Sequence, residues 1–211
     1  MFDPVPLTTL QAHTLGTLIR LEFTAPDDYP CSADTLTIAV DQQPGTPTCG
    51  PIVKSDIHKT LAELVRYSLV RVLQQKDGFQ YKQNASKVFW LKPAQLALLG
   101  ILFLGGPLSA KELFRRTHRL YPFRDLQHLL HNLEAVGQDR TPALVHKLPS
   151  TDKVPLFTHL FIEETELARL IVNASPTKTP PQEGRLDELE ERIAELEDMV
   201  NRLLNKPEAG D

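Results

Sequence analysis

The sequence has little of what membrane, secreted and metal-centred proteins use. Its 211 residues include only two cysteines, Cys31 and Cys49, too few for a disulfide framework or a four-cysteine zinc site. The longest apolar run, residues 96–104, is far shorter than the roughly 20 residues that span a bilayer. The first residues lack the basic and apolar regions of a secretory signal. We therefore expect a cytoplasmic protein with reduced thiols and no contact with a membrane.

Catalytic and metal-binding patterns are also missing. His128 and His131 are spaced i, i+3 on a predicted helix, but no third ligand stands at a useful spacing. Neither cysteine has a neighbouring motif that would activate its thiol. We expect a protein that is not an enzyme, with no catalytic residue, no metal and no cofactor.

Charge divides the chain into two unlike parts. Residues 1–162 hold 17 basic and 14 acidic side chains, a net charge of +3, whereas residues 163–211 hold 6 and 13, a net charge of −7. Within the first part, basic residues concentrate in 50–92 and 107–124. Such clusters in a near-neutral protein mark a surface that faces a polyanion, or simply a solvated face.

The first half of the chain has the pattern of a winged helix. Apolar residues at helical spacing predict helices over 8–22 and 55–69, and Ser32 is placed to cap a helix over 33–40. Residues 70–74 and 79–81 read as strands of a hairpin that turns at Asp77-Gly78. Three helices followed by a hairpin is the order of a winged helix.

The same order then repeats. Pro93 opens a helix of apolar residues, and Ser109 and Glu112 form a capping box for a helix that runs to about Tyr121. Asp125 is placed to cap a third helix, and residues 143–148 and 155–161 read as a second hairpin. Because the aromatic residues Phe89, Trp90 and Phe103 lie beside the junction of the two units, we expect them in the core.

We therefore predict a mainly helical α+β protein. Two tandem winged-helix domains, 7–90 and 91–162, share one core and are followed by a short helix over 163–172. A linker rich in proline follows over 173–184.

After the linker, residues 185–205 carry a heptad repeat. The apolar positions are spaced 3, 4, 3, 4, 3 and comprise Leu186, Leu189, Ile193, Leu196, Val200 and Leu203. Largely β-branched residues at a with leucine at d favour a parallel two-stranded coiled coil. We expect a homodimer, although pairing with another protein or packing on the body as a lone amphipathic helix would use the same stripe.

Several motifs resemble the YceH family of bacterial proteins. The turn Ala25-Pro26-Asp27-Asp28-Tyr29-Pro30-Cys31-Ser32 is similar to the Thr-Pro-x-x-Tyr-Pro-x-Ser turn of that family. Residues 104–113 resemble its Leu-Arg-Gly-x-x-Thr-x-Gly-Glu-Leu segment, and Phe123-x-Asp125 and residues 159–161 match as well. The resemblance covers residues 7–161 and implies tandem winged-helix domains and a C-terminal coiled coil, but no activity.

One segment departs from that family. Its members carry the basic run Asn-Gln-Lys-x-Asn-Arg after the second helix, where this chain has Asp41-Gln42-Gln43-Pro44-Gly45-Thr46. If that run binds an anion in the family, we expect the contact to be weakened or absent here.

Two functions remain open. The first is binding of double-stranded DNA, as in a regulator of transcription. The reason is that the third helix of a winged helix enters the major groove and the hairpin touches the backbone. The candidate contacts are Ser55, His58, Lys59, Arg66, Lys76, Lys82, Arg115, Arg116 and Arg119. The second is an adaptor that docks a partner protein through its winged helices and coiled coil. Phosphate contacts weaken steeply with salt, whereas apolar docking does not.

Overall fold

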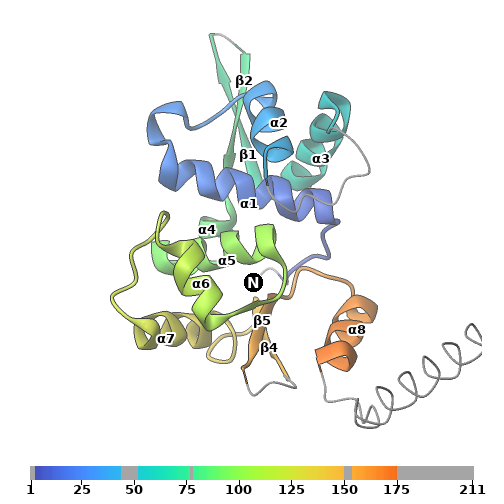
Figure 1. Ribbon diagram of the computed structural model, residues 1–211. Helices are drawn as coiled ribbons and strands as arrows, with labels where there is room; N and C mark the ends of the chain where they lie inside the picture. Colours follow the sequence, from blue (N-terminus) through green and yellow to red (C-terminus); the bar gives the residue numbers. More distant parts are fainter. Residues whose placement is uncertain (1–2, 44–51, 77, 150–153, 175–211) are drawn as a thin grey trace, which may run out of the picture. The chain divides into compact units, whose positions relative to one another are not determined.

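The first repeat contains three helices and a two-stranded hairpin, in the predicted order (Figure 1). The structure, a computed structural model, describes residues 3–43, 52–76, 78–149 and 154–174. The elements of this repeat are α1 (Thr9–Thr24), the 3₁₀ turn η1 (Pro26–Asp28), α2 (Ala33–Asp41), α3 (Lys54–Arg66), β1 (Val70–Gln75) and β2 (Gly78–Gln83).

The second repeat has the same order and one additional strand. After the short helix α4 (Ala85–Val88) come α5 (Pro93–Gly105), β3 (Leu108–Ser109), α6 (Ala110–Thr117), α7 (Leu126–Val136), β4 (Val145–Leu148) and β5 (Leu156–His159). The helix expected over 163–172 is present as α8 (Glu164–Ala174). The mainly helical α+β fold is thus confirmed, with small antiparallel sheets.

Side chains begin the helices where the sequence predicted them. The Ser32 hydroxyl accepts from the Thr35 amide at the start of α2. At the start of α6, Ser109 and Glu112 form a reciprocal capping box. These contacts satisfy backbone N–H groups that have no partner inside the helix, and so fix where each helix starts.

Two helices end earlier than predicted. The helix expected over 55–69 stops at Arg66, because Ser68 adopts a left-handed backbone with φ of 61°. The Leu69 and Ser68 amides then donate to the Leu64 and Val65 carbonyls, the hydrogen-bond pattern of a Schellman motif. The helix expected to reach Tyr121 ends at Thr117, whose carbonyl accepts from the amide of Tyr121 at 2.8 Å.

The hairpins close each repeat in the same way. β3 pairs antiparallel with β5, placing Leu108 opposite Phe157. In the first repeat, an isolated bridge between Cys31 and Tyr81 takes this place. A capping serine, Ser32 or Ser109, follows the bridging residue in both repeats. The two repeats therefore share the same arrangement, a β-bridge to the hairpin followed by a capping serine. The spacing of apolar residues in the helices did not predict it.

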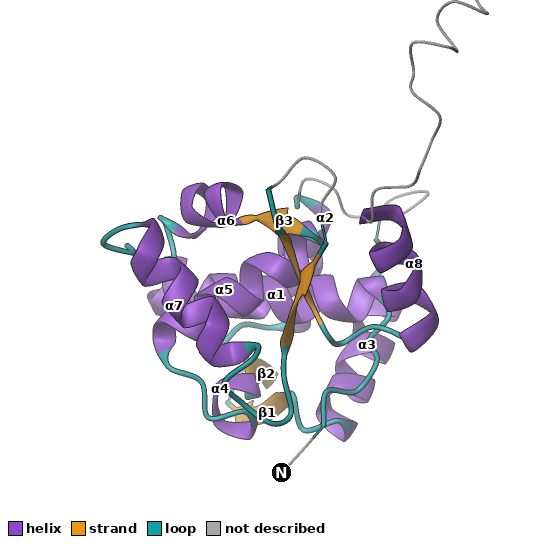
Figure 2. Cartoon of the chain, turned by 90° about the horizontal axis from the view of Figure 1, so that it is seen from below, coloured by secondary structure: helices purple, strands orange, loops and turns teal. Residues whose placement is uncertain are grey.

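One hydrophobic core joins the repeats through the contact of α1 with α5 (Figures 1 and 2). Two glycines allow the helices to approach this closely. A Cβ atom on Gly16 would lie 2.9 Å from Cγ of Leu104, and one on Gly100 would lie 2.6 Å from Cγ2 of Ile19. Because neither glycine has a side chain, the helices approach closely, and Leu15, Leu18 and Leu99 on these two helices are buried.

The expectation that Trp90 lies in the core is wrong. Phe89 and Phe103 are buried, but the Trp90 side chain is 89% exposed. Trp90 follows the end of α4 with a left-handed backbone, φ of 52°. The Leu91 amide donates to the Ser86 carbonyl at 2.8 Å. This turn buries Leu91 and directs the indole of Trp90 outward.

The heptad over 185–205 and most of the linker over 173–184 lie outside the described residues. Among the residues that are described, no helix is long and apolar enough to cross a membrane.

Candidate nucleic-acid interface

Helix α3 separates its residues into a core face and an exposed face. Ile57, Leu61 and Leu64 are fully or almost fully buried. The exposed side chains include all four residues predicted for this helix, Ser55, His58, Lys59 and Arg66. The spacing of Ser55, Lys59 and Arg66 along the helix places them in one stripe.

Two of the basic side chains on α3 form no ion pair with a carboxylate among the described residues. Lys54, at the start of α3, forms an ion pair with Asp34 of α2. Lys59 and Arg66 form none within the part of the chain that the structure describes. The Arg66 guanidinium lies 5.4 Å from the centre of the Tyr67 ring. Both charges remain available to an anion.

The wing of the first repeat, formed by β1 and β2, adds three cations. Lys76 is exposed at the turn. Arg71 and Lys82 are directly opposite each other in the antiparallel register, and residues paired in this way project from the same face of a hairpin. Lys82 is half-buried and lies near Glu22, whereas Arg71 is exposed and has no ion pair among the described residues.

Arg71 is a site residue that the sequence prediction missed. A turn centred on Asp77-Gly78 would place Lys82 opposite Leu73. In the structure, Gly78 belongs to β2 and pairs with Gln75, which moves Lys82 opposite Arg71. The positive φ of Gly78, 123°, is a backbone conformation that favours glycine there.

The remaining candidates lie elsewhere. Arg115, Arg116 and Arg119 are exposed on or just after α6 and line a hollow with Arg20, in the C-terminal half of α1. Helix α3 instead contacts the first turn of α1, where Gln11 donates to Glu63 at 2.5 Å. Figures 1 and 2 show α3 and α6 on opposite sides of α1. The nine predicted residues therefore form two separate groups.

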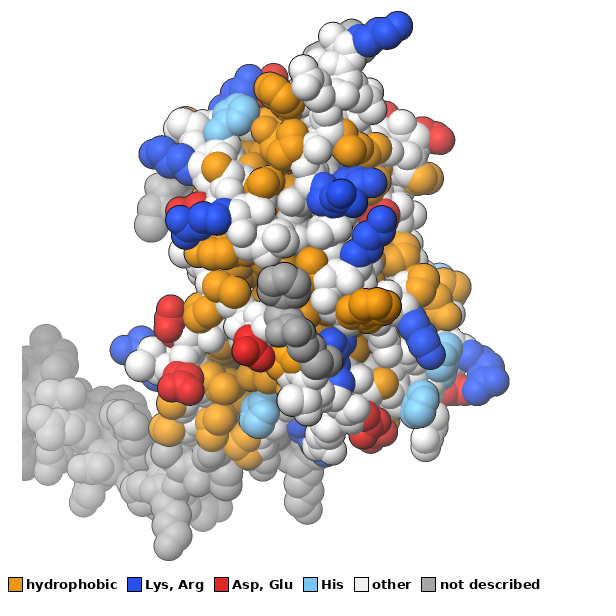
Figure 3. All heavy atoms as spheres, turned by 180° about the vertical axis from the view of Figure 1, so that it is seen from behind, with side chains coloured by type: hydrophobic (Ala, Val, Ile, Leu, Met, Phe, Trp, Pro, Cys, Tyr) orange, Lys and Arg blue, Asp and Glu red, His pale blue; other side chains and the backbone are white. Residues whose placement is uncertain are grey.

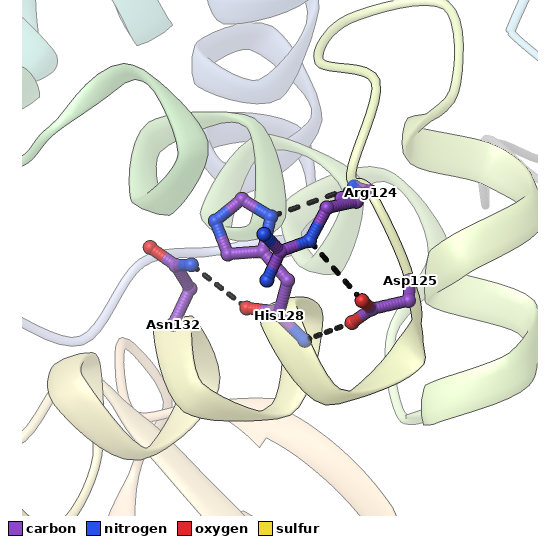
Figure 4. Close-up of polar contacts among 4 residues, drawn as sticks. All are labelled: Arg124, Asp125, His128 and Asn132. Atoms are coloured by element: carbon purple, nitrogen blue, oxygen red, sulfur yellow. Dashed lines mark hydrogen bonds and ion pairs between the residues drawn. The ribbon is translucent and has the colours of Figure 1, made fainter.

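The third helix of the second repeat, α7, presents little free positive charge (Figure 4). Asp125 accepts from the His128 amide at 2.7 Å, and its other oxygen pairs with Arg124 at 3.2 Å. The backbone hydrogen bond at His128 is the main cause that lowers the pKa of Asp125, which keeps this carboxylate charged beside Arg124. Asn132 is buried and donates to the His128 carbonyl.

Cys31 does not provide a reactive thiol. Its side chain is buried, and burial raises its pKa to about 11. Within the described residues, no three histidine, cysteine, aspartate or glutamate side chains gather where a metal ion could bind. Cys49 lies outside the described residues.

On the face opposite to that of Figure 1, lysine and arginine side chains are spaced apart over the surface (Figure 3). Apolar and uncharged side chains separate them. On this face the positive charge does not form a single continuous patch, and any anion contact there depends on small groups of cations.

The comparisons with known sequences point to one family. The sequence profile described as "Protein of unknown function, DUF480" matches residues 7–153. A "UPF0502 protein" of Xanthomonas campestris pathovar campestris is 30% identical over 213 residues, covering 95% of this chain and 94% of the relative. A "UPF0502 protein" of Pseudomonas savastanoi pathovar phaseolicola is 29% identical over 206 residues, covering 95% and 93%.

A third relative, the "UPF0502 protein" of Cellvibrio japonicus, is 29% identical over 212 residues and covers 97% of this chain and 96% of the relative. The similarity thus extends over almost the whole length of the proteins, including both repeats. The chain belongs to the DUF480/UPF0502 family of bacterial proteins.

Proposed function

We propose that this chain binds double-stranded DNA in the bacterial cytoplasm through the first repeat, as a regulator of transcription. The observation that carries the proposal is the pairing of Arg71 with Lys82 on the wing. Like charges placed directly opposite each other destabilise a hairpin. An anion between them removes that cost, and DNA phosphate is the anion that a winged helix is shaped to meet.

Helix α3 supplies the other contacts. Ser55, His58 and Arg66 are the side chains suited to base edges in the major groove, while Lys59 neutralises phosphate. Their exposure supports this role, as does the lack of an ion pair at Lys59 and Arg66 among the described residues. The motifs shared with the YceH family extend the proposal to those proteins.

The test is a fluorescence-anisotropy titration of the full chain with mixed genomic duplex fragments at about 50 and 200 mM salt. We expect binding that weakens steeply at the higher salt concentration. The double variant Lys59→Glu/Arg66→Glu should lose binding while remaining folded. Lys147→Glu/Arg169→Glu makes the same change in net charge on exposed residues outside α3 and the wing, and should keep it.

No binding at either salt concentration would refute the proposal. Equal loss of affinity in both double variants would also refute it, because net charge rather than α3 would then determine the affinity.

We also propose that two chains pair through the heptad leucines of residues 185–205. A dimer would present two α3 helices, so that two half-sites on one duplex could be bound together. The leucine and isoleucine spacing in the sequence supports this.

A second candidate function, protein docking, is favoured by Trp90. An indole that is 89% exposed at a left-handed position contributes little to folding, and tryptophan is enriched at protein interfaces. If Trp90 docks a partner, Trp90→Ala abolishes co-purification of that partner at both salt concentrations and leaves DNA binding unchanged.

A further inference from the structure

Four arginine side chains converge on one hollow beside α1. Arg20 extends from α1. Arg115 and Arg116 extend from α6, and Arg119 lies two residues beyond its end. The hollow has a volume of about 570 Å³, within the range of small-molecule sites. None of its lining residues belongs to α3 or to the wing, so it is separate from the proposed DNA interface.

These positive charges are not balanced by ion pairs. In the described part of the chain, none of the four arginines has a carboxylate oxygen within 4.0 Å. The nearby acid, Glu112, accepts through its Oε2 from both the amide and the hydroxyl of Ser109, and its charge attracts Arg116 and Arg115 only from beyond ion-pair distance. Several guanidinium groups close together repel one another unless an anion joins them.

The local structure holds two of the guanidinium groups in place. With the Gln43 amide turned so that its oxygen faces Arg20, Nε and Nη2 of Arg20 donate to it at 2.8 and 2.7 Å. Gly105 leaves room for Arg116, because a Cβ atom at Gly105 would lie 2.9 Å from Arg116 Nη1. Burial lowers the pKa of Arg20, so its charge is already partly stripped of water before any ligand arrives.

The hollow also has an apolar part. Ile101, Leu104 and Leu120 line it together with the arginines. A free phosphate ion would leave this surface unused. A ligand with an apolar or aromatic body and more than one phosphoryl group matches both parts, because arginine binds phosphoryl oxygens through paired N–H groups.

We propose that this hollow binds a small organic polyphosphate of the nucleoside di- or triphosphate class, and does so independently of DNA. The phosphoryl groups contact Arg115, Arg116 and Arg119, and the nucleoside body lies on the side chains of Ile101, Leu104 and Leu120. Arg20, held by Gln43, fixes the inner end of the phosphate chain.

The test is isothermal titration calorimetry of the full chain with ATP, inorganic triphosphate and AMP. We expect ATP to bind more tightly than inorganic triphosphate because of the apolar contacts, and at least about tenfold more tightly than AMP because of the added charge-assisted hydrogen bonds. The variant Arg116→Gln/Arg119→Gln should lower ATP affinity at least about tenfold. Arg124→Gln, which removes an exposed arginine that does not line the hollow, is the control and should leave it unchanged.

Four results would overturn the proposal. Three of them are no heat of binding with ATP, equal affinity for ATP and AMP, and equal ATP affinity in the wild type and Arg116→Gln/Arg119→Gln. A fourth is displacement of ATP by duplex DNA with parallel loss of both affinities in that variant, which would assign the hollow to DNA phosphate. Unchanged ATP binding in Lys59→Glu/Arg66→Glu would support the site, and would separate it from the DNA interface even if the chain binds no DNA.

Discussion

Ser68 and Trp90 occupy equivalent positions, each one residue beyond the cap of a helix that ends in a left-handed turn. Their φ angles are 61° and 52°, and the next residue in each case donates its amide back into the helix. Glycine is the usual residue at this position because a side chain there costs roughly 1–2 kcal/mol. The chain carries this cost twice.

Ser68→Gly should therefore stabilise the protein. We expect a gain of about 0.5–1 kcal/mol in the free energy of unfolding, since part of the relief is offset by the greater entropy of glycine in the unfolded chain. Ala62→Gly, on the exposed face of α3, should have the opposite sign and a similar size. Urea unfolding measures both, and a loss of stability in Ser68→Gly would contradict the strain.

Stability should fall between pH 7 and pH 5 because of His159. Burial, with a smaller effect from the charge of His13, lowers its pKa to about 4, and its Nδ1 has no hydrogen-bond partner among the described residues. The unfolded chain therefore takes up the proton first, near its ordinary pKa of 6.5. The stabilisation is complete above that pH and falls by about 2 kcal/mol at pH 5.

Other titratable groups lie close to His159, so a variant is needed to assign the decline to this histidine. His13, Glu163 and Glu166 line the same pocket, and burial lowers the pKa of His13 in the same direction. His159→Phe should flatten the decline between pH 7 and pH 5, whereas the exposed His131→Phe should leave it unchanged. An equal slope in the wild type and His159→Phe would show that other groups cause the decline.

The wing variant Arg71→Gln/Lys82→Gln should change stability and DNA affinity in opposite directions. Removing two facing like charges should raise the free energy of unfolding by at most about 0.2–1 kcal/mol, because the attraction of Lys82 to Glu22 is lost as well. The same change should lower the slope of log affinity against log salt concentration by about 2, because two phosphate contacts disappear. Lys147→Gln/Arg169→Gln should alter neither property. A wing variant with unchanged DNA affinity would remove the wing from the interface.

The helix contact at Gly100 should tolerate no side chain. Gly100→Ala brings a methyl group against Ile19 and should destabilise the protein by about 1–3 kcal/mol. In an Ile19→Ala background, the added cost of Gly100→Ala should shrink, because Cγ2 of Ile19, the nearest atom to the added methyl group, is gone. A double-mutant cycle by thermal unfolding measures this coupling, and strictly additive effects would mean that the clash is relieved elsewhere.

The heptad prediction can be tested in the full chain. Leu189→Lys/Leu196→Lys places charges at two d positions and should change the sedimentation mass from that of two chains to that of one. Glu191→Lys/Asp198→Lys, at two f positions, makes substitutions away from the predicted seam and should leave the mass unchanged. A wild-type chain that sediments as a monomer would end the coiled-coil dimer proposal.

Most of the architecture was predictable because its signals are local. Ser32, the Ser109–Glu112 pair and Asp125 begin helices through contacts over three residues, and apolar spacing identified the core face of α3. Trp90 escaped prediction because its place depends on a left-handed backbone that its residue type does not favour. Arg71 was not predicted as a site residue because the hairpin register differs at Gly78 from the expected one. Arg20 was not predicted because the α6 arginines that line the same hollow are distant in sequence.

The close contact of α1 with α5 has a consequence for the evolution of the chain. Tandem domains joined by a flexible linker can be duplicated, exchanged or lost one at a time. Here Gly16 and Gly100 each border on side chains of the other repeat, so a larger side chain in one half requires a matching change in the other. We therefore expect the two repeats to change together, and neither half to fold when it is transplanted into another protein without its counterpart.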